Sequence, residues 1–104
     1  MTKLTILVTV DSAGKPHCTP VVEKKQVEIT WEMATPGWEI DDLIGLSKSD
    51  FPNQKKDGKG FKSNAVHPAG SGPTDHEYLI AVKSSGAMDT ILTSERAVIR
   101  NDPG

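Results

Sequence analysis

The stretch from residue 27 to residue 42, VEITWEMATPGWEIDD, decides the fold. Its first seven residues, VEITWEM, alternate apolar and polar side chains, and WEID alternates again after the turn residues ATPG. Alternation of period two is typical of a β-strand that turns one face to a core and the other to water. We therefore predict two strands here, joined as a hairpin through the Pro-Gly turn.

Two tryptophans flank this turn, and the hairpin register decides where they point. A loop of ATPG pairs Met33 with Trp38, whereas a loop of Pro36-Gly37 alone pairs Met33 with Ile40. The two registers differ by two residues, so both place Trp31 and Trp38 on the same face of the sheet. Large aromatics with aliphatic cross-strand partners usually supply core burial, so we expect both indole rings in the core and not on a binding platform.

Further strands are predicted from alternation and from β-branched residues. We expect Pro20 to restrict the second of them to a sheet edge or a bulge. Phe61 is expected to anchor another, and the doubly apolar segment 78–82 is expected to be central. The predicted segments are residues 3–11, 18–22, 60–66, 78–82, 88–92 and 97–100, with a short strand or helical turn over 43–46 and a turn over 93–96.

Seven to eight short strands with turns at intervals of about 8–12 residues predict an all-β fold. We expect an antiparallel two-sheet sandwich, and the length of 104 residues indicates one domain spanning residues 1–104. Residues 47–76 are rich in Lys, Pro and Gly and lack a sustained pattern, so they are predicted to form one long loop region around the strand near residue 60.

The chain resembles a group of small uncharacterised bacterial proteins with an immunoglobulin-like or cupredoxin-like β-sandwich. The motifs that carry the resemblance are VEITW at 27–31, Trp38 in the following segment, YLIAV at 78–82 and IRNDP at 99–103. The resemblance implies a sandwich of one of these two kinds and implies no activity.

Composition and charge narrow the classes of function. A net charge of −2 gives no general attraction to nucleic acid or to an anionic membrane, so neither is expected as a partner. The single cysteine, Cys18, excludes an intrachain disulfide. Threonines interrupt the apolar residues near the N-terminus, which predicts a strand and not a signal peptide, and no apolar run approaches the ~20 residues of a membrane span. We expect a cytoplasmic monomer, although self-association through the edge strand with Pro20 stays open.

One basic cluster stands out. Lys55, Lys56, Lys59 and Lys62 gather around Phe61 within the predicted loop region. Loops at the ends of rigid sandwiches often carry binding, so we predict a non-enzymatic interaction module that contacts a protein or another ligand through its loops, with these five residues as candidate binding residues. The lysines could instead contact phosphate, but the acidic total charge favours a solvated loop whose lysines discourage edge-to-edge pairing of sheets.

Two further hypotheses concern metal binding and catalysis. His67 and His76 bracket a Gly/Pro-rich loop and could hold copper or zinc, but Cys18 lies far from the position that a type 1 copper site requires, so we expect no cofactor. Catalysis is the weakest hypothesis, because His17 and Cys18 are adjacent on a predicted strand and must point to opposite faces. We predict that the protein is not an enzyme.

Overall fold

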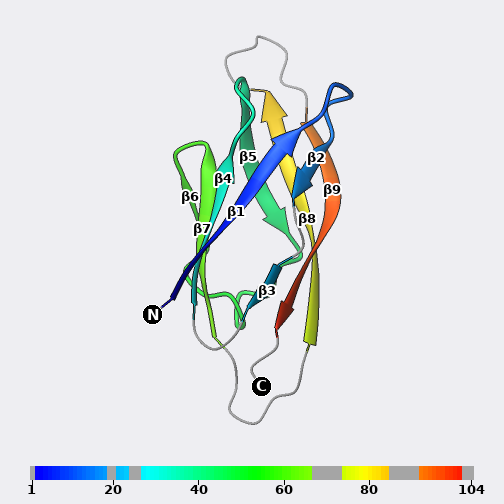
Figure 1. Cartoon of the computed structure of the whole chain (residues 1–104). Coiled ribbons are helices and arrows are strands. Elements are labelled where there is room, and N and C mark those ends of the chain that lie inside the picture. The colour runs from blue at the N-terminus through cyan, green and yellow to red at the C-terminus, as the bar shows by residue number, and fades with distance from the viewer. Residues whose placement is uncertain (1, 19–20, 24–26, 67–73, 85–91, 102–104) are drawn as a thin grey trace.

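The structure is a computed structural model that describes residues 2–18, 21–23, 27–66, 74–84 and 92–101, and every regular element in these ranges is a strand (Figure 1). One sheet has five strands in the order β2-β1-β4-β7-β6, and the other has four in the order β3-β9-β8-β5. The predicted all-β fold with two sheets is therefore confirmed. The strands are β1 (Thr2–Val10), β2 (Pro16–Cys18), β3 (Val21–Glu23), β4 (Val27–Met33), β5 (Trp38–Ile44), β6 (Lys55–Asp57), β7 (Gly60–Ala65), β8 (Thr74–Ser84) and β9 (Leu92–Asn101).

The sheets are mixed, and the prediction of a purely antiparallel sandwich is wrong. β1 pairs with β4 in parallel, and β3 pairs with β9 in parallel. The reason lies in the segment predicted as one strand over residues 18–22, which is two strands in different sheets. β2 and β3 run the same way in succession, so the chain returns in β4 alongside β1 and in its direction (Figure 1). Pro20, which has no N–H to give to either sheet, lies outside the described residues.

The predicted hairpin through the Pro-Gly turn is also wrong. β4 pairs with β1 and β7, whereas β5 pairs with β8 in the other sheet. The turn is a bridge between the sheets, and it is fixed to β1 by hydrogen bonds from the Ala34 N–H to the Val8 carbonyl and from the Val10 N–H to the Thr35 hydroxyl, both 2.8 Å long. A Pro-Gly turn suits either connection, so local sequence did not distinguish them.

Both tryptophans nevertheless belong to the core, as predicted. Trp31 is completely buried and Trp38 is half-buried against the core cluster, each contributed by a different sheet. The Trp31 indole N–H donates a hydrogen bond of 3.0 Å to the Tyr78 hydroxyl across the sandwich. Phe61 and Tyr78 meet the Trp31 ring edge-on, with centroids 6.5 Å and 6.2 Å away. Burial raises the pKa of Tyr78 well above its usual range, so the phenol stays neutral. Its hydrogen bond with Trp31 joins the two sheets at the centre of the core.

A bulge in β5 explains its odd sequence, WEIDDLI. The register to β8 shifts between Ile40 and Asp42, so Asp41 is an extra residue without a direct partner. The shift changes which positions point inward, and Leu43 is buried instead of Asp42. The strand therefore continues to Ile44, the second residue of the segment predicted as a short strand or helical turn over 43–46, and Gly45 with its φ of 83° turns the chain there.

The long loop region predicted over 47–76 contains more structure than expected. The strand near residue 60 is confirmed as β7, but β6 precedes it as an edge strand and β8 begins at Thr74. The turn predicted over 93–96 is wrong, because β9 is continuous and pairs with β8 from Leu92 to Asn101. Its polar residues were mistaken for a turn, although exposed Arg96 follows the strand alternation beside buried Ala97. Residues 88–91, predicted as a strand, lie outside the described residues. The central position predicted for 78–82 is confirmed, since β8 lies between β9 and β5.

Candidate functional site

The predicted binding residues lie on the hairpin formed by β6 and β7, here called the basic hairpin (residues 55–65), at one edge of the five-stranded sheet. Lys55 and Lys56 are on the edge strand β6, Lys59 is in the turn, and Lys62 is on β7. The three lysines of β6 and the turn are exposed, and Lys62 is half-buried. Phe61 is only 6% exposed and contacts Trp31, so its predicted role at the binding surface is not supported and it belongs to the core.

The basic hairpin is firmly attached to the sandwich. The Ile40 N–H of β5 donates a 2.8 Å hydrogen bond to the Lys59 carbonyl, which ties the hairpin turn to the other sheet. Gly60 approaches the Trp31 carbonyl so closely that a Cβ atom there would collide with that oxygen. The lysines therefore project from a fixed backbone, so binding at this hairpin would cost little conformational entropy.

The segment before β6 lies along the same edge of β7 as β6, beyond the end of their pairing. The N–H groups of Asn64 and Val66 donate 2.9 Å hydrogen bonds to the carbonyls of Pro52 and Asp50. Asn53 then adopts a left-handed backbone conformation with φ of 63°, a conformation that asparagine tolerates better than most residues. This turn leads the chain from its contact with β7 into the edge strand, and it leaves the Asn53 side chain exposed beside the hairpin.

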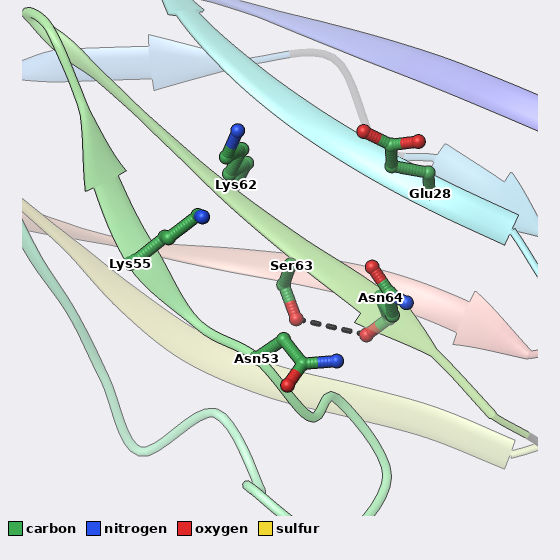
Figure 2. Close-up of a pocket in the computed structure, with 6 residues that line it drawn as sticks. All are labelled: Glu28, Asn53, Lys55, Lys62, Ser63 and Asn64. Atoms are coloured by element: carbon green, nitrogen blue, oxygen red, sulfur yellow. Dashed lines mark hydrogen bonds between the residues drawn. The ribbon is translucent and has the colours of Figure 1, made fainter.

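These elements enclose a shallow hollow of about 300 Å³ on the outer face of the five-stranded sheet (Figure 2). Lys55 and Lys62 lie directly opposite each other in the register of β6 and β7. Glu28 comes from β4, where it pairs with Asn64. The hollow is lined by Glu28, Asn53, Lys55, Lys62, Ser63 and Asn64.

Not every polar group in the hollow is available to a ligand. The Ser63 side chain is 1% exposed, and its hydroxyl lies 2.8 Å from the Asn64 carbonyl and 3.1 Å from the Pro52 carbonyl, both of which are acceptors. Its single proton is therefore used within the protein. The ammonium groups of Lys55 and Lys62 and the side-chain amides of Asn53 and Asn64 remain as donors.

The charges on the basic hairpin differ from those on the four-stranded sheet. Lys83 lies 3.2 Å from Glu39 and 3.5 Å from Asp41, and Arg96 and Arg100 also have carboxylate partners on β8. Within the described ranges, no carboxylate lies within 4.0 Å of the Lys55 or Lys62 ammonium group. Like charges directly opposite on neighbouring strands destabilise a sheet, so this pair does not help the fold. The arrangement can bind an anion.

The residues of the metal and catalytic hypotheses lie elsewhere. His67 is outside the described residues, and His76 is on β8 with its ring edge-on to buried Phe51 at 5.0 Å. Among the residues that the structure describes, no three His, Cys, Asp or Glu side chains are grouped closely enough to hold a metal ion. His17 is exposed and binds Asp11 at 2.7 Å, whereas Cys18 packs against the core. Burial raises the pKa of the Cys18 thiol, which opposes formation of a nucleophilic thiolate.

Sequence reasoning found the lysines but missed the rest of the hollow. Glu28 was identified only as a polar position of an alternating strand, Asn53 as part of the predicted loop region, and Asn64 as part of the predicted strand over 60–66. Their proximity follows only from the pairing of β4 with β7, which brings Glu28 and Asn64 together although they are 36 residues apart in the sequence.

No protein-family model matches the chain, and no curated protein shows significant sequence similarity to it. Within the described segments, no helix is long and apolar enough to cross a membrane.

Proposed function

We propose that this domain is a non-enzymatic binding module that holds an acidic segment of a protein partner on its basic hairpin. The observation that carries the proposal is the Lys55–Lys62 pair, two lysines that lie directly opposite each other in the strand register and have no carboxylate partner among the described residues. An acidic side chain placed between them would convert a local repulsion into two attractive contacts.

An acidic protein segment is a better ligand for this surface than nucleic acid. Proteins that bind single strands combine a basic groove with aromatic side chains on which bases stack. The aromatic residue beside the lysines, Phe61, is buried under the sheet, and the whole chain carries a net charge of −2. The basic hairpin therefore supplies charge without a stacking surface.

We also infer that the sandwich is immunoglobulin-like and not cupredoxin-like. In the immunoglobulin arrangement one sheet has strands A, B, E and D and the other has C, F and G. The order β1-β4-β7-β6 corresponds to A-B-E-D, and β9-β8-β5 corresponds to G-F-C. β1 departs from that pattern because it runs parallel to β4. In this scheme the basic hairpin is the D–E hairpin, which lies at a sheet edge and so is open to a partner.

A titration followed by amide NMR tests the proposed function. The probe is an acetylated and amidated pentapeptide with two Glu residues separated by Thr, at low ionic strength, and its control is the same peptide with Gln in both places. We expect the Glu peptide to shift the amide signals of residues 53–64, and we expect the Gln peptide to leave them unchanged. Raising the salt concentration above about 0.5 M should weaken the shifts, because exposed charges are screened.

Two double variants of equal charge locate the site. Lys55→Ala/Lys62→Ala should weaken peptide binding at least fivefold, whereas Lys15→Ala/Lys48→Ala removes two exposed lysines outside the hairpin and should change it less than twofold. Equal binding by the two double variants, or an absence of shifts in residues 53–64, would show that the basic hairpin does not bind acidic segments.

A further inference from the structure

β6 is the outermost strand at one side of the five-stranded sheet, and all three of its residues are exposed (Figure 1). It pairs with β7 on one side, and no described strand pairs with its other side. An open strand edge offers backbone N–H and carbonyl groups to an extended chain, which can bind by adding a strand to the sheet. The groups on offer are those that do not already bond to β7.

The turn of the basic hairpin determines the direction of these groups. Asp57 pairs with Gly60 across the two residues of the turn, and the pair that closes such a turn is hydrogen-bonded. Along an antiparallel ladder, hydrogen-bonded pairs alternate with pairs that do not bond to each other. Lys56 and Phe61 form the next pair, so the N–H and carbonyl of Lys56 point away from β7 to the open edge. Within the described ranges, no other group forms a hydrogen bond with them.

The side chains along this edge favour an acidic chain. Lys55 points to the outer face of the sheet, where it lines the hollow. Lys56 lies opposite the inward-facing Phe61, so its side chain leaves the strand on the other face. Consecutive residues of an added strand also point to opposite faces. Two consecutive acidic residues therefore place one carboxylate beside Lys55 and one beside Lys56, and opposite charges on neighbouring strands attract.

We propose, on the basis of the function proposed above, that the acidic segment binds by adding a strand to the open edge of β6. The Lys56 N–H donates to a carbonyl of the segment, and the Lys56 carbonyl accepts from one of its N–H groups. The ligand is an extended segment with two consecutive Asp or Glu residues. A second copy of this chain fits the edge less well, because its Lys56 would lie directly opposite Lys56 and only Lys55 and Asp57 would match.

Strand addition identifies the backbone N–H group of the segment that must face the protein. In an antiparallel addition, the first acidic residue lies opposite Lys56 and exchanges both hydrogen bonds with it. In a parallel addition, the first acidic residue lies opposite Lys55, and its carbonyl accepts from the Lys56 N–H. In both directions the first acidic residue turns its N–H toward β6, and the second turns its N–H to solvent. N-methylation of the segment therefore distinguishes the two positions.

The probe is an acetylated and amidated hexapeptide in which two Thr residues flank each side of two consecutive Glu residues. Two further peptides carry an N-methyl group on the first Glu or on the second. A fourth peptide is an isomer of the first in which one Thr separates the two Glu residues. Dissociation constants are taken from the amide shifts of residues 53–64 at pH 7.5 and low ionic strength.

Two variants test the same contact from the protein. Lys56→Pro and Lys56→Ala both remove the charge, but only proline also removes the backbone N–H. Proline is tolerated on an edge strand where the missing N–H would face solvent, so the fold should be kept. Urea unfolding checks that the two variants have the same stability within about 1 kcal/mol.

We expect N-methylation of the first Glu to weaken binding by about fivefold or more, because it removes a backbone hydrogen bond and places a methyl group against the edge. N-methylation of the second Glu should weaken it less than twofold. Lys56→Pro should bind the unmodified peptide at least threefold more weakly than Lys56→Ala does. The isomer should bind wild-type protein at least twofold more weakly than the probe, because only one of its Glu residues meets a lysine of β6.

Failure of this inference is distinguishable from failure of the proposed function. If no peptide shifts residues 53–64, the proposed function itself is wrong and strand addition with it. If peptides bind but the two N-methylated forms do not differ, if Lys56→Pro binds as well as Lys56→Ala, or if the isomer binds as tightly as the probe, the basic hairpin still binds acidic segments and strand addition is refuted. A change in the sedimentation of the free protein in Lys56→Pro alone would show that a second copy occupies the edge, which also refutes it.

Discussion

The five-stranded sheet ends in a hairpin at each edge, and the two hairpins use their charged residues differently. In the β1–β2 hairpin, the Asp11 carboxylate accepts hydrogen bonds from the N–H groups of Ala13 and Lys15 and pairs with the His17 ring at 2.7 Å. In the basic hairpin, Lys55 and Lys62 face each other and pair with no carboxylate of the described chain.

The difference separates charges that shape the fold from charges that are left for a ligand. The β1–β2 turn needs Asp11 to satisfy its backbone, as Asp commonly does in turns. The basic hairpin is held by backbone contacts at Lys59 and Gly60, so the side chains of Lys55 and Lys62 are not needed to attach it. We therefore expect charge changes to affect stability in the first hairpin and binding in the second.

The largest effect is expected from breaking the attachment of the basic hairpin. Gly60→Ala places a Cβ atom against the Trp31 carbonyl, and because backbone cannot move aside as a flexible side chain does, we expect a loss of about 3 kcal/mol in the free energy of unfolding. Urea unfolding measures it. The matched control is Gly58→Ala in the same hairpin, where the space is open but φ is 62°, and about 1 kcal/mol should be lost. A smaller loss in Gly60→Ala than in Gly58→Ala would mean that the hairpin is not held at this point.

A second variant tests whether the buried Trp31–Tyr78 hydrogen bond stabilises both hairpins. Tyr78→Phe removes the acceptor of the buried Trp31 N–H, and an unsatisfied buried donor costs about 2 kcal/mol. Trp31 pairs with Phe61 of the basic hairpin. At the end of β2, burial raises the pKa of the Cys18 thiol, and its hydrogen bond with Tyr78 partly offsets that rise. Hydrogen exchange should therefore become faster in both hairpins. Faster exchange in only one of them would show that the hairpins differ in attachment as well as in charge.

The fold was predictable where the signal is local. The alternation around Trp31 fixed a strand and its buried face, because a residue's side of the sheet depends only on its position along the strand. The partner of each strand is not local. The Pro-Gly turn after Met33 suits a hairpin as well as a bridge between sheets, and only the packing of the whole sandwich selects the bridge.

The candidate site also combines residues that the local sequence identifies with residues that only the tertiary fold brings together. The lysines were found because they are close in sequence, but β6 was not predicted as a strand, since Lys and Asp are depleted in strands and pairing with β7 overrides that preference. Glu28 and Asn53 join the lysines only through the tertiary fold. Phe61 was expected both to anchor the strand near residue 60 and to join the binding cluster, and because alternation along β7 turns it inward, only the anchoring role agrees with its burial.

The pH dependence of stability should depend on the β1–β2 hairpin. The hydrogen bond from His17, followed by that from the Lys15 N–H, lowers the pKa of Asp11 below its ordinary value of 3.8. The unfolded chain therefore takes up this proton first as the pH falls, so the contribution of Asp11 is complete above about pH 5 and is lost as the pH falls through the lower folded-state pKa. Asp11→Asn keeps the turn acceptor but does not titrate.

Urea midpoints at pH 6 and pH 3 measure this contribution. The fall in midpoint should be smaller in Asp11→Asn than in the wild-type protein, and Asp57→Asn in the basic hairpin, which has no ion pair among the described residues, should behave like the wild type. An equal fall in all three proteins would remove the distinction between the two hairpins.

The smallest effect on stability, and the sharpest test of the comparison, comes from reversing one charge of the basic hairpin. Lys55→Glu replaces the repulsive pair with a cross-strand Glu–Lys pair, which should stabilise the protein by about 0.5 kcal/mol because opposite charges on neighbouring strands attract. The same change should abolish binding of the Glu peptide, since the new carboxylate occupies the place of the ligand. Lys48→Glu, with the same change in net charge, should leave both quantities nearly unchanged. A gain in stability together with a loss of binding is the signature of charges kept for a partner, whereas a loss of both would mean that Lys55 serves the fold after all.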